Sequence, residues 1–113
     1  MKEKIVINCT PHDITIVGKD GSIVATIMKS GIIPRLHEVI HEVGNINIDG
    51  VEVPIKNKEF GGCENLPEKR ESTFLIVSGL IAQAVRRDDL LVPNTVRDGK
   101  GQIIGCDSFA QIR

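Results

Sequence analysis

The sequence contains no tryptophan and no tyrosine, and its only aromatic residues are Phe60, Phe74 and Phe109. Proteins that bind single-stranded nucleic acid stack successive bases on several aromatic side chains. Three phenylalanines exclude a long track of that kind. Only a binding site that needs one or two rings is compatible with this composition.

An excess of charge of one sign is also missing. Lys and Arg number 14, Asp and Glu number 15, and the net charge is −1. Proteins that bind duplex nucleic acid carry a strong basic surface, so we expect no nucleic acid polymer as a partner. Any nucleotide that this chain binds should be small.

Long hydrophobic runs and paired cysteines are absent as well. The longest apolar run, residues 74–77, is far too short to span a bilayer, and the N-terminus leads directly into a strand-like segment. Cys9, Cys63 and Cys106 are odd in number and lie far apart. We therefore predict a soluble, unsecreted protein with reduced thiols, without a disulfide framework or a zinc site.

Aliphatic residues are abundant, and most of them are β-branched. Ile and Val together number 28, whereas Leu numbers six. β-Branched side chains pack well on a pleated sheet and lose rotamer freedom in a helix. This composition favours sheet and argues against an all-helical bundle.

Turn-forming residues predict three β-hairpins. The clearest turns at Asp49-Gly50, where apolar residues alternate on both sides, from Ile46 to Ile48 and from Val51 to Ile55. Two more turn at residues 18–21 and 98–101. The polar stretch 56–70, which contains two adjacent glycines and a proline, is predicted to be a surface loop.

The C-terminal half follows a different pattern. Residues 73–77 predict a buried strand, and residues 79–87 predict a short helix capped by Ser78. We predict one α+β domain spanning residues 1–113. It should consist of antiparallel hairpins, with one or two short helices in its C-terminal half, and divide into parts at about 1–56 and 71–113.

One motif suggests catalysis. His37, Glu38 and His41 match the H-E-x-x-H pattern in which two histidines on a helix bind zinc and the Glu activates water. However, Asn47 stands where a third histidine would be needed, and no histidine follows it. A polar surface that carries two histidines explains the segment better, and a small zinc-dependent peptidase is kept as an alternative.

Another stretch suggests ligand binding. Between residues 86 and 107, three Arg and one Lys alternate with four Asp. Guanidinium groups suit phosphates, and Asp carboxylates suit ribose hydroxyls. Surface ion pairs around a hairpin would explain the same composition.

Several short segments, taken together, resemble a known family. They occur in this order along the chain: Asn8-Cys9-Thr10-Pro11-His12, Ser30-Gly31 with Arg35, Asn65-Leu66-Pro67, Val77-Ser78, residues 87–93, and residues 97–106. Together they resemble a family of small phage proteins that usually open with Asn-Leu-Thr-Pro-His. This family is identified as including the first phage anti-Thoeris sponges.

The resemblance implies a function without catalysis. Such sponges bind the cyclic ADP-ribose isomer that a bacterial defence uses as its alarm signal and keep it from the defence effector. The implied protein is not an enzyme and needs no cofactor or metal. It would work in the cytoplasm of the infected host as a homo-oligomer, a dimer or a hexamer, with ligand pockets between protomers. Some relatives are thought to hold cyclic di- or trinucleotides at separate sites.

The resemblance also implies a set of site residues. Phe74 would stack on the adenine, and Arg97 and Arg35 would supply cations for the pyrophosphate or the base. Hydrogen bonds to ribose and base are assigned to the following residues: Gln83, Thr95 and Asp107. A third possibility, besides the sponge and the peptidase, is a phage accessory protein whose surface binds another protein.

Overall fold

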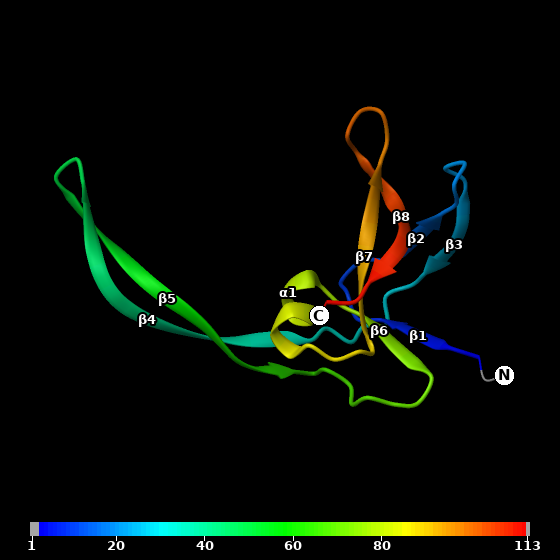
Figure 1. Cartoon of the computed structure of the whole chain (residues 1–113), viewed down its shortest axis with the longest axis horizontal. Helices are drawn as coiled ribbons and strands as arrows, with labels where there is room; N and C mark the ends of the chain where they lie inside the picture. The colour runs from blue at the N-terminus through cyan, green and yellow to red at the C-terminus, as the bar shows by residue number, and fades with distance from the viewer. Residues whose placement is uncertain (1–2, 113) are drawn as a thin grey trace.

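The computed structural model describes residues 3–112, which form eight strands and one short helix (Figure 1). The elements, in chain order, are β1 (Ile5–Asn8), β2 (Ile14–Val17), β3 (Ile23–Ile27), β4 (Arg35–Ile48), β5 (Val51–Glu64), β6 (Thr73–Ile76), α1 (Gly79–Val85), β7 (Leu90–Arg97) and β8 (Ile103–Ala110). Strands take up more than half of the chain. The fold is therefore richer in β-structure than the predicted α+β class implies.

Six of the strands form one mixed sheet in the order β1-β6-β7-β8-β2-β3. The pairs β2–β3 and β7–β8 are antiparallel hairpins, as predicted from their turns. The pairs β1–β6, β6–β7 and β2–β8 are parallel. The N-terminal strand thus lies beside a strand almost 70 residues later in the chain.

The remaining two strands, β4 and β5, form a long antiparallel hairpin that projects from the sheet (Figure 1). We call this hairpin, residues 35–64, the arm. Its turn at Asp49-Gly50 confirms the predicted one, and both residues have the positive φ values that a tight hairpin turn requires. The predicted loop at 56–70 was wrong in its first part, because residues 56–64 continue β5.

The core lies on both faces of the six-stranded sheet around β6. Leu75 packs in a buried cluster with Ile81 and Ala82 of α1, while its neighbour Ile76 packs on the opposite face with Ile14 and Cys106. Successive strand residues point to opposite faces, so a strand that is apolar throughout requires cover on both. The apolar run at 74–77 is therefore explained by its central place in the sheet.

Helix α1 begins where its sequence predicts but ends two residues earlier than the predicted end at Arg87. The Ser78 hydroxyl accepts a hydrogen bond from the backbone N–H of Ile81, which is the predicted N-cap. The helix ends at Val85, because Arg86 takes a left-handed conformation with φ of 55°. This seven-residue helix is the only helix within residues 3–112. It is too short to cross a membrane.

Asn8 joins β1 to the β2–β3 hairpin. Its buried amide donates to the carbonyl oxygens of His12 (2.8 Å) and Ile27 (3.0 Å). Its side-chain oxygen accepts from the backbone and the hydroxyl of Thr10, at 3.0 and 2.6 Å. The Asn-Cys-Thr-Pro-His segment is thus a structural junction in which the buried amide is fully hydrogen-bonded.

Gly105 allows β8 to approach β2 closely. A Cβ atom at this position would lie 2.6 Å from the carbonyl oxygen of Thr15. We predict that Gly105→Ala lowers the free energy of unfolding by about 1–3 kcal/mol, because the parallel pair must move apart. Urea denaturation measures this change.

The matched control is Gly99→Ala in the β7–β8 turn, where an added Cβ meets nothing within 4 Å. It should change stability by less than about 0.5 kcal/mol. Equal effects of the two substitutions would contradict the close contact between β2 and β8.

Candidate functional site

A cavity of about 490 Å³ lies where β1, β6 and the start of β7 meet the segment before β6. Its lining is mostly polar and charged: Lys4, Lys69, Arg70, Glu71, Ser72, Thr73, Phe74, Asp88, Asp89 and Gln111. Cavities of 300–1,000 Å³ accommodate small organic ligands. This cavity is the candidate site.

Phe74 provides the cavity's one aromatic surface. It is half-buried on β6, between the buried Thr73 and Leu75. The parallel register sets Val6 of β1 beside Phe74, so Lys4, two residues earlier, projects on the same face. The Lys4 Nζ atom lies 5.6 Å from the ring centroid, a cation–π contact.

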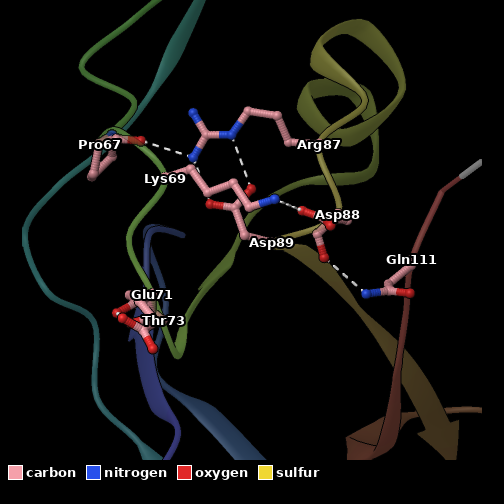
Figure 2. A network of polar contacts seen from close by, with 8 residues as sticks. All are labelled: Pro67, Lys69, Glu71, Thr73, Arg87, Asp88, Asp89 and Gln111. Carbon is pink, nitrogen blue, oxygen red and sulfur yellow. Dashed lines mark hydrogen bonds and ion pairs between the residues drawn. The ribbon is translucent and has the colours of Figure 1, made fainter.

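Behind this surface, Arg87 and Asp89 form a bidentate ion pair (Figure 2). Arg87 Nε and a terminal nitrogen donate to the two carboxylate oxygens of Asp89 at 2.9 and 2.6 Å. The same terminal nitrogen also donates to the carbonyl oxygen of Pro67 at 3.0 Å. The pair therefore ties the segment before β6 to the loop between α1 and β7.

The Arg87–Asp89 pair is largely removed from solvent, since the two side chains are 25% and 5% exposed. The hydrogen bonds from Arg87 hold the pKa of the Asp89 carboxyl below its ordinary value, although burial opposes this shift. Asp89 is thus an ionised carboxylate whose charge is already neutralised. It is a structural group of the cavity wall.

The cavity rim carries a second, exposed ion pair. Lys69 Nζ lies 2.5 Å from a carboxylate oxygen of Asp88, and the side chains are 58% and 73% exposed. The backbone carbonyl of Asp88 accepts a hydrogen bond from the Gln111 amide at 2.8 Å, and Figure 2 shows Asp88 between Lys69 and Gln111. An exposed pair contributes under about 1 kcal/mol, so Lys69 is able to turn toward an anionic ligand.

The charges of the cavity favour an anion. Three cations line it, and of its three carboxylates Asp89 is neutralised by Arg87. A slight positive charge beside one aromatic ring suits a phosphorylated compound with a flat base. Hydroxyl and amide groups in the lining can bind a sugar.

Of the six predicted ligand residues, the structure places Phe74 in this cavity and the other five outside it. Arg97 lies at the far end of β7, seven residues beyond Leu90, which is paired with Leu75 of β6. At 3.3 Å per residue that distance is roughly 23 Å. Arg97 is exposed there and donates to the carbonyl oxygen of Gly101 at 2.7 Å.

The other predicted residues are divided among three elements. Thr95 and Asp107 lie close together on the β7–β8 ladder, where Thr95 is paired with Cys106. Gln83 is exposed on α1, and Arg35 begins the arm opposite Glu64. A protomer therefore brings Thr95 and Asp107 together but keeps them apart from Phe74.

Several residues of the cavity were missed in the sequence. Lys4, Lys69 and Arg70 supply its cations, yet none belongs to a recognisable motif. Only the parallel pairing of β1 with β6 brings Lys4 to the ring. The charge-dense stretch beginning at residue 86 contributes Asp88 and Asp89 to the cavity lining.

The His37–His41 segment is a strand of the arm, so it lacks the helical geometry that the zinc-peptidase alternative requires. Residues four apart in a strand lie about 13 Å apart. His37 Nε2 lies 2.8 Å from Glu64 Oε1, and His41 is paired with Asn57. Among residues 3–112, no group of three His, Cys, Asp or Glu side chains could hold a metal ion.

The three cysteines are free thiols, two of them buried. Burial raises the pKa of Cys9, Cys63 and Cys106 above the ordinary value of a thiol. A raised pKa keeps a thiol protonated and poorly nucleophilic. None of these side chains lines the cavity.

Comparison with known proteins found no relative: no protein-family model, curated protein or solved structure matches this chain.

The stability of the protein should depend on the Arg87–Asp89 pair in the cavity wall. We predict that Asp89→Asn lowers the free energy of unfolding by about 3 kcal/mol, because it leaves a largely buried guanidinium without its counter-charge. Asp88→Asn, which removes only the exposed pair with Lys69, should cost less than about 1 kcal/mol. Chemical denaturation of the two variants measures the difference.

The same pair predicts a pH dependence. Because the pKa of Asp89 is lowered in the folded protein, its stabilising contribution is complete above about pH 4 and disappears as the pH falls through the folded-state pKa. The wild-type protein should lose more stability below pH 4 than Asp89→Asn does. If the free energy of unfolding fell equally with pH in the two proteins, this result would contradict an ionised, paired Asp89.

Proposed function

We propose that this protein binds and sequesters a cyclic ADP-ribose-type signalling nucleotide without altering it, and so counters a bacterial anti-phage defence in the host cytoplasm. The observation that carries the proposal is a cavity lined by Phe74 and three cations, Lys4, Lys69 and Arg70, with the Lys4 ammonium over the Phe74 ring. The resemblance of the sequence to phage anti-Thoeris sponges supports the same function.

Each part of such a ligand has a matching group in the cavity. The half-buried ring of Phe74 offers a face on which adenine stacks, and the Lys4 ammonium above it attracts the phosphates. Lys69 and Arg70 lie on the segment that forms the rim and suit the pyrophosphate. The Asp88 carboxylate and the Ser72 hydroxyl suit the ribose hydroxyls.

The lining favours binding over catalysis. It contains no histidine and no cysteine, and all residues of these two types lie within the described part of the chain. Its one buried carboxylate, Asp89, has a lowered pKa and is held by Arg87, so it is a poor proton acceptor. A sequestering protein needs affinity alone, which these groups supply.

The remaining predicted ligand residues stay part of the proposal in a different place. Arg97, Thr95 and Asp107 lie on the exposed β7–β8 hairpin, away from the Phe74 ring. Together with Gln83 and Arg35, they would reach a ligand in that cavity only from another protomer. In this proposal a second protomer supplies them, as the resemblance to the sponges implies.

Binding of the nucleotide should depend on the ring of Phe74. We predict that Phe74→Ala weakens binding of cyclic ADP-ribose isomers by about 1–3 kcal/mol, roughly 5- to 150-fold, because the adenine loses its stacking partner. Isothermal titration calorimetry measures the affinity of each variant.

Phe60→Ala is the matched control, since Phe60 lies on the arm and is 41% exposed there. This variant should bind as the wild type does. Equal affinities of wild type and Phe74→Ala would show that the ligand does not occupy this cavity.

A further inference from the structure

The Lys4 ammonium covers the ring face that the cavity offers to a ligand. Lys4 and Phe74 both line the cavity. The Lys4 Nζ atom lies over the Phe74 ring, 5.6 Å from its centroid. Lys4 is exposed, whereas Phe74 is half-buried. The ammonium therefore lies on the cavity side of the ring.

A stacked adenine and this ammonium need the same space. Carbon atoms of two stacked rings lie about 3.5–4.0 Å apart. An ammonium 5.6 Å from the ring centroid would then lie roughly 2 Å from the plane of the base, well inside van der Waals contact. Lys4 must therefore leave the ring before any base stacks on Phe74.

The Lys4 side chain can leave without disturbing the fold. The N–H group of Ile5, the next residue, donates to the carbonyl oxygen of Ser72 at 2.7 Å, so the backbone beside Lys4 is anchored. The four-carbon stem of a lysine is flexible, and an exposed cation–π contact is weak. Only the side chain has to move.

The charge of Lys4 is available to a ligand. Lys4 belongs to neither of the two ion pairs described above. A phosphate close to the base would offer the ammonium a charge-assisted hydrogen bond, which is stronger than its exposed contact with the ring. A phosphorylated ligand thus compensates for the contact that it displaces.

We propose that Lys4 makes the cavity selective for phosphorylated adenine compounds over neutral nucleosides. Any base that stacks on Phe74 displaces the ammonium, but only a base that carries a phosphate gives the ammonium a new partner. Selectivity of this kind comes from a penalty against the wrong ligand. The inference rests on the proposed function, because it takes the Phe74 ring as the surface on which the base stacks.

The position of Lys4 can be tested without a ligand. Protons above an aromatic ring resonate upfield because of the ring current, and the Lys4 methylene group next to Nζ lies near the face of Phe74. We expect its proton resonance upfield of that of Lys19, an exposed lysine in the turn between β2 and β3. Equal chemical shifts of the two side chains in the nuclear magnetic resonance spectrum would overturn the inference.

Selectivity is tested with two probes, adenosine and cyclic ADP-ribose. Lys4→Ala should bind adenosine about 2- to 5-fold more tightly than the wild type does, because the ring face is open. It should bind cyclic ADP-ribose about 5- to 30-fold more weakly, because the phosphates lose a charge-assisted contact. Titrations followed by nuclear magnetic resonance measure both affinities.

Two further variants serve as controls. Lys19→Ala removes a lysine outside the cavity and should change neither affinity. Lys4→Arg keeps a cation beside the ring and should keep the wild-type preference for the phosphorylated probe.

The outcomes separate this inference from the proposed function. If the wild type binds cyclic ADP-ribose, the role of Lys4 is overturned by an affinity of Lys4→Ala that is unchanged for either probe or that shifts in the same direction for both. If the wild type does not bind cyclic ADP-ribose, the proposed function is wrong. Tighter adenosine binding by Lys4→Ala would then still support the exclusion of nucleosides by Lys4, and its absence would overturn that role as well.

Discussion

The bidentate pair between Arg87 and Asp89 connects the segments from which the cavity is built. Arg87 follows α1, Asp89 precedes β7, and Pro67 belongs to the segment that leads into β6. One guanidinium group thus joins the loop between α1 and β7 to the segment before β6, and its planar shape suits two parallel hydrogen bonds and a third. Residues 69–72, which contribute two of the cavity's three cations, are positioned by this contact.

The six-stranded sheet with α1, which we call the body, and the arm differ in how their side chains are covered. In the body, apolar residues of β6 are covered on both faces, and the buried Asn8 amide satisfies its hydrogen bonds within the chain. The arm is anchored to this body only at its base, where Leu36 and Cys63 pack against the core. Beyond that point its apolar side chains face solvent in the single chain.

Local features of the fold could be predicted from the sequence, whereas long-range pairings could not. Asp49-Gly50 marks a hairpin turn and Ser78 marks a helix start, because both act through neighbouring backbone groups. The extension of β5 to Glu64 was missed, since a polar solvent-exposed strand has the composition of a loop. Phe74 was predicted because it stands in a strand-like segment, although Phe60 and Phe109 also lie on strands, β5 and β8. Lys4 was not, because only the β1–β6 pairing brings it there.

The central claim is that the cavity holds a cyclic ADP-ribose-type nucleotide and leaves it unchanged. The most direct test incubates the purified full-length protein with cyclic ADP-ribose isomers, removes free ligand, denatures the protein by heat and identifies the released compound by mass spectrometry. We expect stoichiometric recovery of an intact isomer. Release of a hydrolysed product, or of no nucleotide at all, would contradict the account.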